Sequence, residues 1–176
     1  MLRSQITLEP LLDQLPDRPY SAILGRIDYP EQQAQPLYTL SFPRCGNVLI
    51  VGSAGSGKST LVQTILYTLC IRQTPELLNW YALDCSNHRL DVLRSTPHCG
   101  GIVYPEEEEK VKRLFSQLTE LMQERKRTLA DAGAANAEDY RASGRGVMPL
   151  TLVVLDNYAG FMESYERFAV PLLRLL

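Results

Sequence analysis

The glycine-rich segment at residues 52–59 constrains the fold of this chain more than any other feature. An apolar run at residues 48–51 leads into Gly-Ser-Ala-Gly-Ser-Gly-Lys-Ser, which is the eight-position pattern of a phosphate-binding loop. Glycines let the backbone turn tightly and point successive N–H groups at a phosphate. We therefore expect a short buried strand over residues 48–51, then the loop, then a helix from about Lys58 whose positive end faces the same anion.

Each position of this loop has a predicted role in binding a nucleoside triphosphate. Lys58 is expected to reach the β- and γ-phosphates, and the Ser59 hydroxyl to complete the shell of a Mg²⁺ ion. A chance glycine-rich turn is the competing interpretation, and the strand-then-helix context argues against it. The predicted nucleotide-binding residues are Gly52, Ser53, Ala54, Gly55, Ser56, Gly57, Lys58, Ser59 and Thr60.

The composition is that of one ordinary globular domain. The chain has 176 residues, of which 45% are apolar and 22% charged, enough for one core but short for two. A net charge of -2 gives no electrostatic reason to expect nucleic acid as the main partner. No apolar run approaches the roughly 20 residues that span a bilayer, and no signal-peptide core begins the chain, so we expect a cytoplasmic protein. The four cysteines form no Cys-x-x-Cys pair and are interpreted as reduced thiols.

Hydrophobic periodicity predicts the other elements. Residues 1–30, punctuated by prolines, are interpreted as a lead-in, and residues 31–176 as the domain. Within that domain we expect strands and helices over residues 36–42 (strand), 58–72 (helix), 77–84 (strand), 101–104 (extended) and 106–132 (long helix).

Charged runs on the long predicted helix have a simple explanation. Residues 106–109 are four glutamates, which the positive end of a helix dipole favours. Arg125, Lys126 and Arg127 are interpreted as the solvated face of the same helix. An acidic binding site and a basic contact surface remain the alternatives. A zinc site built from Cys85, His88, His98 and Cys99 is a further alternative, but their spacing does not match the usual zinc motifs.

A second chemical pattern lies at residues 150–157, where a strand-like apolar run ends in Asp156 and Asn157. An aspartate at the end of such a strand matches the residue that holds the Mg²⁺ shell in phosphate-loop ATPases. The pattern is weak alone, but it is informative beside the loop. Because a predicted strand at residues 77–83 lies between the two motifs along the chain, the order suits the RecA-like branch of the fold.

Asn157 departs from the usual pattern. Enzymes of this branch usually carry a glutamate after the aspartate, and that glutamate polarises the attacking water. Asn157 cannot take a proton at neutral pH, so we predict nucleotide binding with slow or absent hydrolysis, and expect Asn157→Glu to raise hydrolysis in a complete domain. Asp84 remains an alternative carboxylate for the same task.

Several segments together resemble a known family over residues 23–176. The chain resembles the FtsK/SpoIIIE motor superfamily, and within it the tandem ATPase domains of the EssC/EccC proteins of type VII secretion. The segments that carry the resemblance are residues 25–35, 52–60, the strand ending at Asp84, residues 97–103, residues 124–127 and residues 156–158.

This resemblance implies an α/β, RecA-like (ASCE) P-loop NTPase fold with a mainly parallel sheet flanked by helices. It further implies an ATP-binding module of a membrane-anchored, ring-forming protein, with neighbouring ATPase domains or subunits as partners and small WXG100-type proteins as substrates. Triphosphate contacts then fall on Gly55, Gly57, Lys58, Ser59 and Thr60, and Mg²⁺ on Ser59 and Asp156. The remaining alternatives are a DNA-translocating FtsK/SpoIIIE-type motor and a small-molecule phosphotransferase.

The resemblance also implies that the domain is incomplete at its C-terminus. Complete domains of this family continue past the strand at residues 151–155 with further strands and a sensor residue. Here an apolar segment expected to be helical, residues 172–176, ends the sequence. We therefore expect an exposed strand edge and self-association unless a partner covers that edge.

Overall fold

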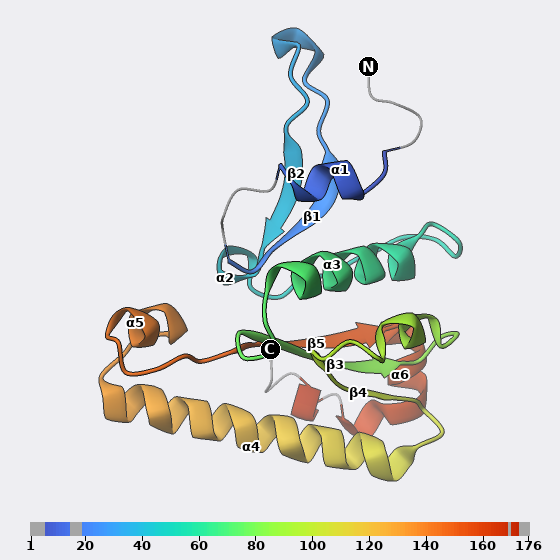
Figure 1. Cartoon of the computed structure of the whole chain (residues 1–176). Coiled ribbons are helices and arrows are strands. Elements are labelled where there is room, and N and C mark those ends of the chain that lie inside the picture. Colours follow the sequence, from blue (N-terminus) through green and yellow to red (C-terminus); the bar gives the residue numbers. More distant parts are fainter. Residues whose placement is uncertain (1–5, 15–18, 169, 173–176) are drawn as a thin grey trace. The chain divides into compact units, whose positions relative to one another are not determined.

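The chain folds into two compact units, Met1–Thr74 and Pro75–Leu176 (Figure 1). The structure is a computed structural model, which describes residues 6–14, 19–168 and 170–172. The segment expected to be helical at residues 172–176 therefore lies mostly outside the described residues. No helix in the described ranges has the length and apolar character needed to cross a membrane.

The first unit is built on an antiparallel strand pair and one helix. Its strands run side by side from Ser21↔Ser41 to Arg26↔Leu37, with an irregularity after Ile23. The helix packs against the first strand, where the Ile23 N–H donates to Thr68 Oγ1 at 3.3 Å. The elements are α1 (Glu9–Leu12), β1 (Ser21–Arg26), η1 (Pro30–Gln32), β2 (Leu37–Ser41), α2 (Phe42–Cys45) and α3 (Lys58–Arg72).

Strand β2 and helix α3 confirm their predictions, but two features of this unit differ. Strand β1 lies in the segment interpreted as a lead-in, and its Ala22 and Ile23 are fully buried. The domain boundary at residue 31 stays a prediction. The prediction of a buried strand over residues 48–51 is wrong: these residues are irregular, and Leu49 and Val51 are 81% and 82% exposed. A strand needs a neighbour for its backbone groups, and the described strands of this unit pair with each other.

The second unit contains a parallel sheet with the strand order β4-β3-β5. Its strands are β3 (Leu78–Asp84), β4 (Cys99–Val103) and β5 (Leu150–Asp156), close to their predicted positions. The β3–β5 register runs from Leu78↔Leu150 to Asp84↔Asp156, so the two aspartates lie side by side at the carboxyl ends of their strands. Among the described residues β5 pairs only with β3. Self-association through its other edge stays a prediction.

Helices α4 (Glu108–Ala132) and α6 (Tyr158–Tyr165) share one core with the sheet (Figure 1). Helix α4 confirms the predicted long helix, and its apolar side chains are more buried in its first half than in its C-terminal half. The remaining elements are η2 (Arg89–Leu93), α5 (Ala137–Ala142) and η3 (Glu166–Phe168). Residues of the core are Leu83, Val103, Val111, Leu114, Phe115, Leu118, Phe161, Tyr165 and Leu172.

Arg125 is not on the solvated face where the sequence pattern placed it, whereas Lys126 and Arg127 are exposed as predicted. Arg125 Nη2 donates to Thr151 Oγ1 of β5 at 2.7 Å, and Thr151 Oγ1 donates to Asn79 Oδ1 of β3 at 2.6 Å. Burial lowers the pKa of the Arg125 guanidinium below its usual value. The three side chains therefore tie α4 to two strands of the sheet.

Replacing Thr151 with valine should lower the free energy of unfolding by about 1–2 kcal/mol, because a half-buried guanidinium and an amide both lose their partner. Urea unfolding followed by circular dichroism measures the change. Thr7→Val, at an exposed position of the other unit, is the control. An equal effect of both substitutions would show that the hydrogen bonds of Thr151 do not stabilise the folded chain.

Candidate functional site

The phosphate-binding loop connects the irregular segment at residues 47–51 to α3. Gly55 and Gly57 have φ angles of 76° and 90°, which side chains rarely adopt. At Gly52 a Cβ atom would lie 2.5 Å from Ser56 Oγ. Gly55 and Gly57 therefore need glycine for their backbone conformation, whereas at Gly52 a side chain would meet the Ser56 hydroxyl.

The charged residue of the loop already lies over it. Lys58 Nζ donates to the carbonyl oxygens of Gly52 at 3.0 Å and Ser53 at 2.8 Å. Ser59 and Thr60 follow in the first turn of α3, where the positive end of the helix dipole favours an anion. An ammonium group, a helix N-terminus and glycines in left-handed conformations make a cradle that fits the phosphates of a nucleotide.

The second unit contributes two buried carboxylates at the ends of β3 and β5. Asp84 and Asp156 are 2% and 7% exposed. Ser86 lies between them, with its Oγ 3.2 Å from Asp84 Oδ1 and 2.9 Å from Asp156 Oδ2. Asp84 also accepts the N–H groups of Ser86 at 3.0 Å and Leu90 at 3.4 Å. Because these bonds use both of its oxygens, Asp84 shapes its own loop and is poorly placed to replace a general base.

The same strand ends give the Cys85 thiol an unfavourable setting for ionisation. The pKa of Cys85 rises from 9.0 to about 11. Burial is the largest cause, and the negative charges of three carboxylates add to it: Asp84, Asp156 and Glu106. Cys85 is therefore a neutral thiol at neutral pH, and the carboxyl ends of β3 and β5 form a region of negative potential that suits a cation.

Alkylation of Cys85 should accelerate with pH up to about pH 11 in the folded chain, because only the thiolate reacts. The experiment uses a variant in which Cys45, Cys70 and Cys99 are serine, and measures the rate with iodoacetamide. In denaturant the same variant should level off about two pH units lower, near the pKa of an unperturbed thiol. Identical folded and unfolded profiles would contradict the setting described for Cys85.

Asn157 has a structural task that the sequence pattern did not reveal. Its backbone is left-handed, with φ 66°, a conformation that asparagine tolerates better than most residues. As N-cap of α6, its side-chain oxygen accepts the Gly160 N–H at 3.2 Å, while its Nδ2 donates to the Cys85 carbonyl at 2.9 Å. A Cβ atom at Gly160 would lie 2.5 Å from Asn157 Nδ2. The sequence signal that could have shown this is an asparagine directly before a helix.

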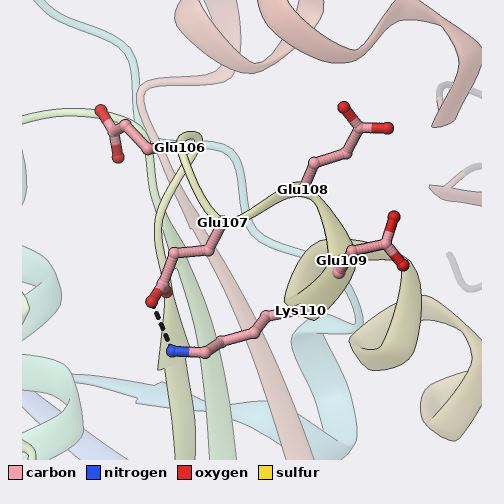
Figure 2. Close-up of a pocket in the computed structure, with 5 residues that line it drawn as sticks. All are labelled: Glu106, Glu107, Glu108, Glu109 and Lys110. Atoms are coloured by element: carbon pink, nitrogen blue, oxygen red, sulfur yellow. Dashed lines mark hydrogen bonds and ion pairs between the residues drawn. The ribbon is translucent and has the colours of Figure 1, made fainter.

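The acidic run forms the entry to α4 and not an enclosed site. Figure 2 shows the shallow hollow lined by residues 106–110, with Glu107 and Lys110 paired across it. Lys112 pairs with Glu108 at 3.0 Å and with Glu109 at 2.6 Å. Nearby lysines and the helix dipole therefore balance these charges, as expected for a solvated helix start.

The predicted site residues lie in both units. Positions 52–60, for which phosphate contacts are predicted, belong to the first unit, and Asp156 belongs to the second. The shared magnesium shell of Ser59 and Asp156 thus stays a prediction.

Comparison with known proteins places the chain in a family. The sequence model of the FtsK/SpoIIIE family matches residues 21–157. The chain is 33% identical over 153 residues to the ESX-5 secretion system protein EccC5 of Mycobacterium tuberculosis, covering 81% of this chain and 11% of that protein. It is 27% identical over 148 residues to the type VII secretion system protein EssC of Staphylococcus aureus, covering 81% of this chain and 10% of that protein. The chain thus spans about a tenth of the length of these relatives.

Comparison with solved structures also finds similarity to EssC and EccC proteins. ATPases 2 and 3 of EssC from Geobacillus thermodenitrificans align with a TM-score of 0.82 and 30% identity, covering 88% of this chain and 30% of that one. The cytoplasmic domain of EccC from Thermomonospora curvata aligns with a TM-score of 0.82 and 24% identity, covering 89% and 19%. The α/β fold with a parallel sheet flanked by helices is therefore the RecA-like fold of these ATPases. The chain belongs to the FtsK/SpoIIIE family and is homologous to the ATPase domains of the EssC and EccC proteins of type VII secretion.

Proposed function

We propose that this chain is an ATP- and Mg²⁺-binding module of a type VII secretion ATPase and that it hydrolyses ATP slowly or not at all. The cradle around Lys58 supports nucleotide binding, because its glycine conformations and its helix N-terminus suit phosphate. The proposal of slow or absent hydrolysis rests on the position and hydrogen bonds of Asn157. It occupies the usual place of the catalytic glutamate, and both polar ends of its side chain are used in structural hydrogen bonds.

In this proposal Ser59 and Asp156 hold the metal ion. When bound, Mg²⁺ neutralises charge on the phosphates. A hydroxyl and a carboxylate are the hard oxygen ligands that Mg²⁺ prefers, and the negative potential at the ends of β3 and β5 attracts a cation. Lys58 leaves the carbonyl oxygens of residues 52 and 53 to contact the β- and γ-phosphates, while the glycine-rich backbone orients them.

We further infer a place in a larger assembly. Because the relatives are much longer and one aligned structure contains ATPases 2 and 3, neighbouring ATPase domains or ring subunits are the expected partners. From the same homology we propose that the module lies at the cytoplasmic face of the membrane and that its substrates are WXG100-type proteins.

Two measurements on the chain test this function. Titration of a fluorescent ATP analogue in the presence of Mg²⁺ should show saturable binding, and phosphate release should stay near the level of a blank. Brisk hydrolysis would contradict the inactive site. A DNA-translocating motor would instead show hydrolysis that duplex DNA stimulates and that falls steeply with salt. We expect no such stimulation, since the chain carries a net charge of -2.

A further inference from the structure

We propose that Ser86 is the positioning residue that orients the Asp156 carboxylate toward a nucleotide-bound divalent cation. The inference rests on the proposed function, because it concerns the same metal site. Ser86 does not belong to the phosphate-binding loop or to the strand that carries Asp156. It lies 70 positions away from Asp156 along the chain, in the loop that follows β3.

The hydroxyl of Ser86 has one proton and two neighbouring carboxylates. Its distance to Asp156 Oδ2 is 2.9 Å and its distance to Asp84 Oδ1 is 3.2 Å. Asp84 already accepts two backbone N–H groups, from Ser86 and Leu90. The Ser86 hydroxyl therefore donates its proton preferentially to Asp156, and this shorter hydrogen bond orients the carboxylate.

The backbone around Ser86 is itself held against the end of β5. The Cys85 N–H donates to the Asp156 carbonyl at 3.0 Å, and Asn157 Nδ2 donates to the Cys85 carbonyl at 2.9 Å. Asp84 fixes the other side of the loop through the Ser86 N–H at 3.0 Å. These bonds place the hydroxyl before any ligand arrives, so that little ordering is required on binding.

The arrangement brings two buried negative charges to one hydroxyl group. Two carboxylates that share one hydroxyl group favour a cation beside them. A hydrogen bond to one carboxylate oxygen controls the direction in which the group meets a metal ion, and loss of such a bond usually lowers metal affinity by about 10- to 100-fold. Ser86 should accordingly affect the metal-dependent part of nucleotide binding and leave the phosphate contacts of residues 52–60 unchanged.

The test compares Ser86→Ala, Ser86→Thr and the control Ser95→Ala, an exposed serine of the same unit. Affinity for a fluorescent ATP analogue is measured in the full chain with saturating EDTA and across a Mg²⁺ titration. We expect Ser86→Ala to require about 10-fold more Mg²⁺ to reach half of the Mg²⁺-dependent gain in nucleotide affinity. Its nucleotide affinity in EDTA should be unchanged. Ser86→Thr keeps the hydroxyl and should stay close to the unmodified chain, as should Ser95→Ala.

Several outcomes would overturn the inference. An unchanged Mg²⁺ requirement in Ser86→Ala shows that the hydroxyl does not orient Asp156. Equal losses in EDTA and in Mg²⁺ show a general structural role, and failure of Ser86→Thr to restore the Mg²⁺ requirement shows that the hydroxyl is not the active feature. Absence of nucleotide binding by the unmodified chain is a separate result that overturns the proposed function itself, and the inference with it.

Discussion

Replacing Lys58 with alanine is expected to weaken ATP binding about 100-fold. Lys58 is the one side chain of the predicted loop that brings a full positive charge to the phosphates. A hydrogen bond to a charged group contributes about 1.5–3 kcal/mol, which corresponds to roughly 10- to 150-fold in affinity. Its ammonium already lies at the loop, bonded to the carbonyl oxygens of residues 52 and 53, so little rearrangement separates it from a phosphate.

Titration of a fluorescent ATP analogue measures this effect, and Lys126→Ala provides the control. Lys126 carries the same charge at an exposed position of α4, so its removal changes the net charge equally. Thermal unfolding of both variants separates lost binding from lost folding. Affinity that stays within about threefold of the unmodified chain in Lys58→Ala would mean that the glycine-rich loop does not hold the triphosphate in the proposed way.

Much of this architecture could be predicted from local patterns. The phosphate-loop motif located the start of α3 at Lys58, and apolar periodicity located α4 and the strands of the parallel sheet. Such signals are local because helix and strand periods repeat within a few residues. Strand β1 escaped prediction because it follows several prolines, and its burial depends on α3, whose Thr68 accepts a hydrogen bond from the Ile23 N–H.

Side-chain hydrogen bonds between distant residues could not be predicted in the same way. The Ser86–Asp156 bond joins positions 70 residues apart, and the Asn157–Cys85 bond joins positions 72 apart. Both depend on the register that places the end of β3 beside the end of β5. The sequence showed that Asn157 departs from a catalytic pattern, but only the register shows which groups use its amide.

The structural hydrogen bonds of the Asn157 side chain change the expected result of Asn157→Glu. A lost catalytic base predicts that glutamate restores hydrolysis. The geometry predicts instead that the variant is less stable by about 2 kcal/mol and hydrolyses ATP no faster than the unmodified chain. Loss of the helix cap costs about 1 kcal/mol, and a left-handed backbone with a longer side chain costs about another. A glutamate also cannot donate to the Cys85 carbonyl as the amide does.

The matched variant for this experiment is Asn157→Asp, which keeps an oxygen for the Gly160 N–H and tolerates the left-handed backbone but loses the donor to Cys85. Its stability should fall between those of the unmodified chain and Asn157→Glu. Urea unfolding and phosphate release are measured on all three proteins. A glutamate variant that is as stable as the unmodified chain and hydrolyses ATP briskly would show that Asn157 is only a missing base. A destabilised, inactive glutamate variant would show that Asn157 stabilises the fold as the N-cap of α6. Restoring catalysis would then require rebuilding that cap together with the carboxylate.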